Sequence, residues 1–369
     1  MANSLIGQID IYTSQECAAL QQQAFKLAVN EPTRCCPYIE PGDSRITMQF
    51  LPPGCIDGIF TSPPYPRNEH DNRKQAYHSI GYGGEGIKAS GRVSNERRRY
   101  GFNSDRDSHG GNGQWVHGKA DQKGITGLTQ EIHPDSWLDW WVPFQAEMKR
   151  ILKPQRPLLV NLGGAVYPQW HRHTYIYELP RLMEQLGWCF VEEFVWAKPN
   201  RPPCTGAGRP IDVTEKIYWF AHGVDEKHPP LWYPRQICSR GENAKKPIVR
   251  NVVDFALGQS RWPVRCNGCH KLIKPLRDRE KHELRCPECG ELAVCLSHFA
   301  AFPRKLADWM VRGWSKPGDV VLDPFAGSGT VGLSAKALGR RFILMELNAG
   351  GEIDVIQARF EQEFWGRRP

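Results

Sequence analysis

Short apolar runs alternate with longer segments of helical periodicity along two parts of the chain. The longer segments place apolar residues at three- and four-residue spacing, whereas the short runs are bounded by turn-forming residues. We therefore predict buried strands at 56–60, 158–162, 190–196, 217–221, 320–322 and 342–346, and helices at 136–152, 179–186 and 331–338. Strands that alternate with helices predict an α/β fold with a mostly parallel sheet.

Two segments interrupt this pattern. Residues 66–132 are rich in Gly, Arg, Asn, Asp and His, and residues 197–300 are rich in Pro, Arg and Lys with weak periodicity. The first segment contains the basic run Arg97-Arg98-Arg99-Tyr100. This run predicts a solvated loop, with a loop that orders on nucleic acid as the alternative.

The composition is that of a large folded chain. It has 369 residues, of which 40% are hydrophobic. No apolar run approaches membrane-spanning length, and the N-terminus lacks a charged start followed by an apolar block. We therefore expect a soluble, cytoplasmic protein with no membrane partner. The formal charge of +8 and the pI near 8.9 favour a polyanionic partner, with an ordinary basic surface as the alternative.

A glycine-containing turn follows the strand at 320–322. The segment from Asp323 to Thr330 joins a strand to a helix, and its glycines let the backbone approach a ligand closely. Such a loop suits the carboxylate or phosphate of a nucleotide-like cofactor, and a purely structural tight turn is the alternative. Glu346 ends the next strand, where ribose hydroxyls are usually bound.

A proline-rich bend follows the strand at 56–60. In Thr61-Ser62-Pro63-Pro64-Tyr65, two prolines fix two φ angles and remove two backbone donors. Carbonyls freed from the sheet can accept bonds from an amino group, and an aromatic ring can stack on a flat substrate. A plain proline turn is the alternative.

Four of the twelve cysteines form two close pairs. Cys266–Cys269 and Cys286–Cys289 are Cys-x-x-Cys pairs separated by 16 residues, which is the spacing of a four-thiolate zinc ribbon. Unrelated thiols and a redox pair are the alternatives, and His270 and His282 are expected at the surface. Residues 261–290 carry eight Lys or Arg and four Asp or Glu, so this part also predicts a nucleic-acid-binding face.

The order of these motifs resembles that of the DNA amino-methyltransferases of the permuted (beta) class. In that class the catalytic half, marked by the proline-rich bend, precedes the cofactor half, marked by the glycine loop. Further similarities cover roughly residues 40–65, 135–222 and 296–360. They are Gly42-Asp43, Lys153-Pro154, the segment 195–200 (Val-Trp-Ala-Lys-Pro-Asn), the segment 298–303 (His-Phe-Ala-Ala-Phe-Pro) and Glu346.

The resemblance implies a fold and a set of parts. The fold would be an α/β, Rossmann-like S-adenosylmethionine-dependent methyltransferase sheet with helices on both faces, a circularly permuted motif order, and an inserted zinc-ribbon and target-recognition region. The expected parts are an N-terminal part of the catalytic domain (1–65), a Gly/Arg-rich mobile insertion (66–132), the continued catalytic domain (133–222), the target-recognition region with the zinc ribbon at 266–289 (223–295) and the S-adenosylmethionine-binding part (296–369).

The same resemblance implies roles for individual residues. Catalysis would fall to Ser62, Pro63, Pro64 and Tyr65, and structural Zn²⁺ would be bound by Cys266, Cys269, Cys286 and Cys289. S-adenosylmethionine would be bound by Asp43, Thr61, His298, Phe302, Pro303, Asp323, Pro324, Phe325, Ala326, Gly327, Ser328, Gly329, Thr330 and Glu346. For Phe302, packing in the core is the alternative.

The implied reaction is direct, in-line methyl transfer to an exocyclic amino group of a base flipped out of double-stranded DNA. The serine of Ser-Pro-Pro-Tyr resembles the cytosine-N4 enzymes, and adenine N6 is the runner-up. A cognate restriction endonuclease is a further implied partner. A non-catalytic zinc-ribbon nucleic-acid binder and an enzyme acting on RNA or protein are the other hypotheses.

Overall fold

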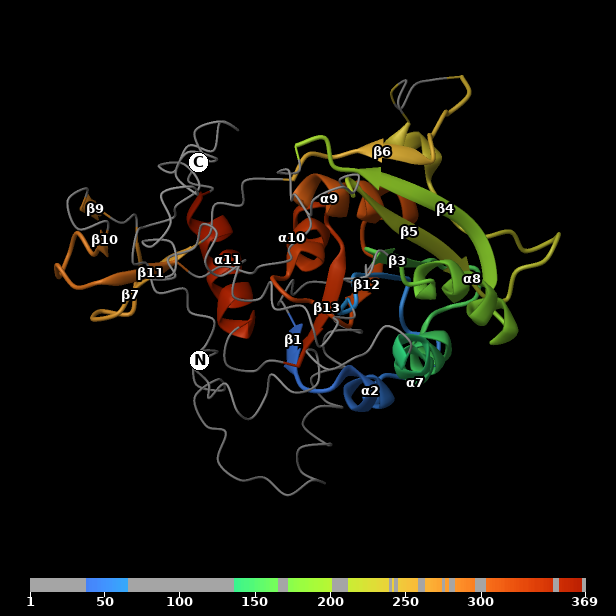
Figure 1. Cartoon of the computed structure of the whole chain (residues 1–369), viewed down its shortest axis with the longest axis horizontal. Helices are drawn as coiled ribbons and strands as arrows, with labels where there is room; N and C mark the ends of the chain where they lie inside the picture. The colour runs from blue at the N-terminus through green and yellow to red at the C-terminus, as the bar shows by residue number, and fades with distance from the viewer. Residues whose placement is uncertain are drawn as a thin grey trace.

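The fold has three layers, with one large sheet between two groups of helices (Figure 1). The computed structural model describes residues 38–65, 136–164, 172–200, 212–238, 241, 245–257, 263–273, 276–278, 283–295, 303–347 and 352–366. The sheet has the strand order β1-β13-β12-β2-β3-β5-β4-β6. Its strands are β1 Tyr38–Pro41, β2 Gly58–Thr61, β3 Leu158–Leu162, β4 Cys189–Ala197, β5 Thr214–Ala221, β6 Val252–Asp254, β12 Val320–Asp323 and β13 Arg341–Glu346.

The sheet is mostly parallel, as the sequence predicted. From β1 through β13, β12 and β2 to β3, every neighbouring pair is parallel, and β6 is parallel to β4. Only β5 runs antiparallel, to β3 on one side and to β4 on the other. No helix was predicted between β4 and β5, and a strand that follows another without a crossover helix can return antiparallel beside it.

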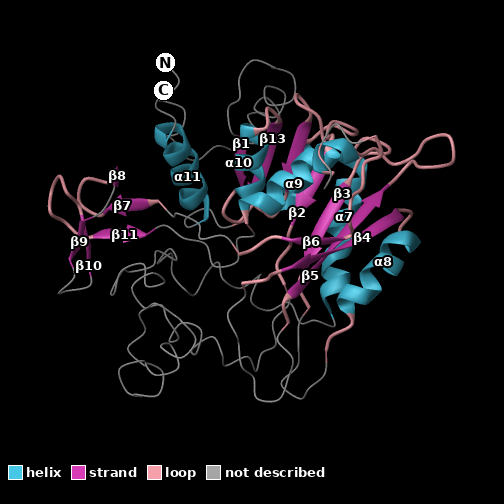
Figure 2. Cartoon of the chain, turned by 90° about the horizontal axis from the view of Figure 1, so that it is seen from above, coloured by secondary structure: helices cyan, strands magenta, loops and turns pink. Residues whose placement is uncertain are grey.

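Helices cover both faces of the sheet because each strand alternates its side chains between them (Figure 2). The helices are α2 Ser44–Thr47, α7 Trp137–Ile151, α8 Tyr175–Gln185, α9 Arg304–Trp314, α10 Thr330–Ala337 and α11 Glu352–Gly366, with short 3-10 turns η1 Met48–Phe50 and η4 Pro234–Ile237. In β3, Leu158 and Val160 pack into the core beneath α7 and α8, whereas Leu159 packs into the core beneath α9 and α10. None of the helices in the described ranges is long and apolar enough to cross a membrane.

Every strand and helix predicted from the sequence is present, with ends shifted by up to four residues. The largest shift is in α8, which begins at Tyr175 although it contains Pro180. Proline cannot donate to the carbonyl four residues before it. That carbonyl, of Ile176, accepts a bond from the hydroxyl of Tyr218 instead, so the helix extends through the proline. The structure adds β1, β6, α2, α9, α11 and the short strands within residues 264–295, which were not predicted.

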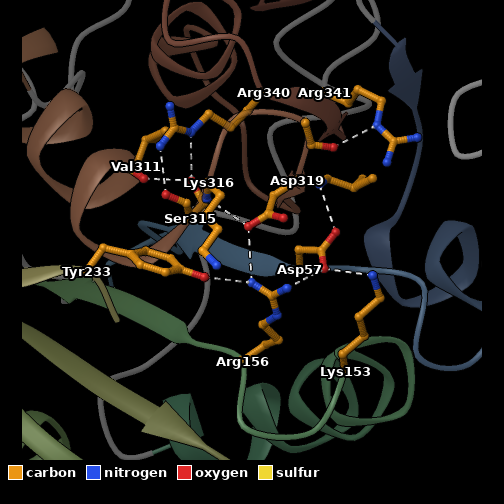
Figure 3. A network of polar contacts seen from close by, with 12 residues as sticks. Asp57, Lys153, Arg156, Tyr233, Val311, Ser315, Lys316, Asp319, Arg340 and Arg341 are labelled. Carbon is orange, nitrogen blue, oxygen red and sulfur yellow. Dashed lines mark hydrogen bonds and ion pairs between the residues drawn. The ribbon is translucent and has the colours of Figure 1, made fainter. Parts of the chain in front are cut away.

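Charged side chains join the amino ends of three neighbouring strands (Figure 3). Asp57, which is 3% exposed, precedes β2 and accepts from Lys153 Nζ at 2.7 Å and from Arg156 Nη2 at 3.1 Å. Its other oxygen accepts from the backbone N–H of Val320 at 3.0 Å. Arg156 also donates to Asp319, just before β12, at 3.1 Å. These contacts fix β2, β3 and β12 side by side, so their carboxyl ends finish along one edge.

The cysteine-containing segment forms two small sheets. The strands are β7 Val264–Cys266, β8 Leu272–Ile273, β9 Leu276–Asp278, β10 Glu283–Arg285 and β11 Ala293–Cys295. Strand β7 pairs antiparallel with β8 and β11, and β9 pairs antiparallel with β10. Figures 1 and 2 both show these strands apart from the eight-stranded sheet.

Candidate active site

The proline-rich bend and the glycine loop meet at the carboxyl edge of the sheet. Their strands, β2 and β12, are adjacent and parallel, with Leu322 opposite Ile59. A direct bond joins the two motifs, because the Thr61 hydroxyl donates to Asp323 Oδ1 at 2.8 Å. Both side chains are buried, at 0% and 2% exposure. The structure thus brings together two motifs that lie 262 residues apart in the chain.

Backbone donors fix the shape of the glycine loop. The N–H of Phe325 donates to Asp323 Oδ1 at 3.2 Å, and the N–H of Gly327 donates to Glu346 Oε2 at 2.7 Å. Both glycines of the loop adopt left-handed backbone angles, with φ of +50° at Gly327 and +73° at Gly329. Glycine is the residue that adopts such angles without strain. Asp323 and Glu346 therefore set the path of the loop from the ends of two adjacent strands.

Burial changes the titration of Asp323. Removal from water is the main cause that raises the pKa of this carboxyl to about 7, and the like charge of Glu346 adds to the rise. Bonds from Thr61 and from the N–H of Phe325 act in the opposite direction. A buried acidic site of this kind favours a ligand that brings positive charge and hydroxyl donors.

Neighbouring elements hold the loop from several sides. The Phe325 ring packs against Phe144 of α7 with ring centroids 4.9 Å apart. The buried hydroxyl of Ser44 donates to the Pro324 carbonyl. From α11, Arg359 Nη1 donates to the Ser328 carbonyl at 2.5 Å. Ser44 and Arg359 were missed in the sequence, because nothing local to either residue indicates a partner about 30 or 280 positions away.

The ends of β1 and α9 carry further predicted cofactor residues. Asp43 follows β1, caps α2 and forms an ion pair with Arg45, while the preceding Gly42 donates its N–H to the Glu346 carbonyl at 2.9 Å. Burial opposes the charge of Asp43, but the bonds from Arg45 outweigh it and lower the pKa of the carboxyl. Pro303 is buried and caps α9.

Several predicted features fall outside the described residues. They include His282, His298, Phe302, the basic run 97–100, the insertion 66–132 and residues 1–37 of the expected N-terminal part.

The proline-rich bend is held by polar contacts with β3, β5 and α7. The Ser62 hydroxyl lies 3.2 Å from the Tyr65 hydroxyl, which in turn lies 2.9 Å from Glu215 Oε2. The indole N–H of Trp137 donates to the Pro64 carbonyl at 2.9 Å. The Tyr65 ring lies against the backbone of Gly163, where a Cβ would be 2.7 Å from the ring. The bend is therefore rigid for reasons beyond its prolines.

The four predicted metal-binding cysteines converge. The sulfur atoms of Cys266, Cys269, Cys286 and Cys289 all lie within 4.8 Å of one another. The two pairs are built alike, because the residue after each second cysteine has positive φ, +58° at His270 and +75° at Gly290. Those two residues donate their N–H groups to the carbonyls of Cys266 and Cys286. Each pair is thus a tight turn that presents two sulfurs to a common point.

Known proteins with similar sequences are type II methyltransferases. M.PvuII of Proteus hauseri is 24% identical over 235 residues, which cover 58% of this chain and 68% of that protein. M.HinfI of Haemophilus influenzae is 28% identical over 236 residues, which cover 63% of this chain and 52% of that protein. The chain therefore matches about half of the length of M.HinfI and two thirds of the length of M.PvuII.

Solved structures share the fold. The PvuII DNA methyltransferase, named as cytosine-N4-specific, aligns with 87% of this chain and 85% of its own, with a TM-score of 0.53 and 19% identity. The protein TTHA0409 of Thermus thermophilus, solved with S-adenosyl-L-methionine, aligns with 90% of this chain and 98% of its own, with a TM-score of 0.50 and 18% identity. At 18–19% sequence identity, these similarities show that the proteins share a fold.

The family assignment comes from a match over most of the chain. A family model for N6 and N4 methyltransferases, described as DNA methylase, matches residues 56–351. This range contains the bend, the glycine loop and the strands that bring them together. The chain therefore belongs to the N6/N4 DNA methylase family.

Proposed function

We propose that the protein transfers a methyl group from S-adenosylmethionine to the N4 amino group of cytosine in double-stranded DNA. The observation that carries the proposal is the bond between Thr61 and Asp323. It joins the proline-rich bend to the acidic, glycine-containing loop, which supports an acceptor for the target amino group beside a cofactor site. The family membership supports the same activity.

The loop fits S-adenosylmethionine by its chemistry. When bound, this cofactor supplies the methyl group, and it carries an ammonium, a sulfonium and two ribose hydroxyls that need acceptors. Asp323 and Glu346 offer carboxylates at the ends of adjacent strands, and the burial of Asp323 makes a cationic ligand favourable there. The other predicted cofactor residues of the loop, 324–330, supply the backbone that surrounds these acids.

The bend would activate the target amino group. An exocyclic amino nitrogen is a poor nucleophile because its lone pair is delocalised into the ring. Ser62 Oγ and the Pro63 carbonyl are the candidate acceptors for its hydrogens, and accepting them favours a localised lone pair. The base has to leave the duplex to reach them, which costs a few kcal/mol, and stacking on Tyr65 would offset about 1–3 kcal/mol.

Cytosine N4 is the favoured position because Ser62 occupies the first position of the Ser-Pro-Pro-Tyr motif. The PvuII enzyme, which has the same fold, is named as cytosine-N4-specific. The order of the motifs, bend before loop, supports a permuted methyltransferase. A companion restriction endonuclease is part of the proposal because the similar proteins are type II methyltransferases.

Nucleoside analysis tests the activity directly. The protein is incubated with unmethylated genomic DNA and methyl-labelled S-adenosylmethionine, and the DNA is digested and examined by mass spectrometry. N4-methylcytosine is the expected product. Formation of N6-methyladenine would show instead that the enzyme methylates adenine at N6, the alternative named above. Ser62→Ala is the matched variant, with a strongly reduced rate and nearly unchanged cofactor binding by calorimetry. An equal loss of cofactor binding would refute this division of roles, and unlabelled DNA with the wild-type protein would refute the activity.

The same proposal includes a structural Zn²⁺ on the four cysteines. Zinc–thiolate bonds of about 2.3 Å in a tetrahedron place sulfurs about 3.8 Å apart. The Cys266–Cys289 and Cys269–Cys286 sulfur pairs lie 3.3 and 3.8 Å apart. Backbone N–H groups of Gly268 and Cys269 point at the Cys266 sulfur, at 3.3 and 3.4 Å, and such donors stabilise thiolate charge.

Elemental analysis tests the metal site. The wild-type protein should contain about one zinc per chain, as expected of a four-thiolate site. Cys269→Ser should lose the metal, whereas Cys189→Ser, a thiol on β4 outside the cluster, should keep it. We further propose that this segment belongs to the target-recognition region. Loss of zinc should then weaken DNA binding and leave cofactor binding unchanged, and a metal-free wild-type protein would contradict the site.

A further inference from the structure

Three polar side chains lie behind the proline-rich bend and have no role in the activity as proposed above. They are Asn161 at the end of β3, Lys198 just after β4 and Glu215 on β5. Asn161 is 1% exposed and Lys198 is 7% exposed. Polar groups at this depth are kept only when they are bonded to one another or serve a ligand. Their contacts lead to Ser62.

The hydrogen bonds among these groups have a defined direction. Tyr65 has one hydroxyl hydrogen, and its oxygen lies near three groups. Glu215 Oε2, at 2.9 Å, is a carboxylate oxygen that only accepts, so Tyr65 donates to it. Asn161 Nδ2, at 2.8 Å, only donates, so Tyr65 accepts from it.

The remaining contact of Tyr65 sets the direction of the Ser62 hydroxyl. Because the hydrogen of Tyr65 is used on Glu215, the 3.2 Å contact requires Ser62 to donate to Tyr65. Burial and the charge of Glu215 raise the pKa of Tyr65 well above its ordinary value, so the phenol stays protonated and the direction holds. With its only hydrogen directed inward, Ser62 Oγ keeps its lone pairs for another donor.

Glu215 is the fixed end of this chain of bonds. Lys198 forms an ion pair with its other carboxylate oxygen, which neutralises a charge that would otherwise be costly at this depth. Asn161 Nδ2 donates to Glu215 Oε2 at 2.7 Å as well as to Tyr65. The alternative orientation of the Asn161 amide, with its oxygen and nitrogen exchanged, is excluded because the amide oxygen would then face the Glu215 carboxylate. Asn161 Oδ1 consequently has no partner within the described part of the chain, although it is buried.

We propose that Glu215 is a positioning residue for methyl transfer. It orders the bonds from Ser62 through Tyr65 so that Ser62 presents only acceptor lone pairs to the substrate amino group. A serine hydroxyl that was free to rotate could instead donate its hydrogen to the substrate nitrogen and occupy the lone pair that has to react. The proposal rests on the proposed function, because it assigns the orientation of an acceptor in that reaction.

The first test replaces the carboxylate. Glu215→Gln can place an N–H opposite Tyr65 and so reverse the direction of the bonds, and it should lower the single-turnover rate of methyl transfer by about tenfold or more. Cofactor affinity should change by less than about threefold. The matched control is Glu193→Gln, which removes a carboxylate that is paired with Lys216 on the same two strands but away from the bend. The control should keep the wild-type rate.

A double-mutant cycle separates positioning from a structural role. If Glu215 acts through Ser62, then Glu215→Gln should have little further effect in a Ser62→Ala background. The inference would be overturned if the rate losses of the two single variants multiplied in the double variant. It would also be overturned if the single-turnover rate of Glu215→Gln were within about twofold of that of the control Glu193→Gln. If Glu215→Gln does not fold, Tyr65→Phe interrupts the same chain without leaving a lysine unpaired. A wild-type rate in that variant would also overturn the inference. Failure of the proposed function is distinct, because the wild-type protein would then transfer no methyl group.

Discussion

Replacing Asp323 with Asn should make the cofactor-free protein more stable at neutral pH while weakening cofactor binding. The amide has the shape of the carboxyl and can still accept from Thr61 and from the N–H of Phe325. It cannot ionise, however, so it avoids both the burial of a charge and the repulsion from Glu346. A residue kept for catalysis or binding at the expense of stability should respond in this way.

The pH dependence of this effect has a defined sign. The Asp323 carboxyl titrates at 3.8 when exposed and at about 7 in the folded protein, so the folded state binds more protons between these values. Wild-type stability therefore falls as the pH rises from about 4 to about 7, and this contribution is constant above pH 7. The full displacement corresponds to roughly 4 kcal/mol. An amide oxygen accepts the bonds from Thr61 and from the N–H of Phe325 less strongly than a carboxylate does, so about 2 kcal/mol is the expected gain of the Asn variant above pH 7.

Urea unfolding of the cofactor-free protein, followed by tryptophan fluorescence, measures the difference at several pH values. Asp319→Asn is the control on the same segment, because Asp319 accepts from Arg156 at 3.1 Å and its replacement should destabilise the protein by about 1–2 kcal/mol. Calorimetry should show that Asp323→Asn binds S-adenosylmethionine about 10- to 100-fold more weakly. A stability difference from wild type that does not grow between pH 4 and pH 7 would falsify the account of Asp323.

Three further substitutions test how the loop is held. Thr61→Val removes the bond to the buried carboxylate and should lower stability by about 1–3 kcal/mol in urea unfolding, whereas an unchanged midpoint would show that the bond is dispensable. Gly329→Ala should lower the free energy of unfolding by about 1–3 kcal/mol, because the residue has φ of +73° and the new Cβ would lie 2.9 Å from Ile356. Unchanged stability would contradict the loop geometry. Arg359→Met keeps the apolar stem of the side chain but removes its bonds to the loop. It should weaken cofactor binding in calorimetry and leave the melting temperature close to that of the wild type, and unchanged cofactor affinity would contradict a role of Arg359 in holding the loop.

The main strands and the two motifs could be predicted because local sequence determines them. All five residues of β3 are buried, so the strand is a nearly continuous apolar run, and the same holds for β12. Each motif directly follows a buried strand. Once both strands were assigned to one mostly parallel sheet, their following loops had to lie on the same edge, and only adjacency of β2 and β12 was left for the structure to show.

The supporting residues could not be predicted because their roles depend on distant parts of the chain. Glu215 lies in a strand where it stands among other polar residues, and its sequence context is that of an exposed position. Its importance arises from register, since β5 returns antiparallel beside β3 and places Glu215 near Asn161 and Tyr65. Arg359 reaches the loop from a helix that was itself not predicted.

The two ends of the central strands differ in how their charges are balanced, and this difference supports the proposed cofactor site independently of motifs. At the amino ends, Asp57 and Asp319 are each bonded to Arg156, so opposite charges are already matched. At the carboxyl ends, the buried Asp323 experiences the like charge of Glu346, and its main donors are a hydroxyl and a backbone N–H. Folding alone does not favour a buried carboxyl of this kind. A cationic ligand would supply the missing balance, so we expect such a ligand to bind at the carboxyl edge of the sheet and not at the amino edge.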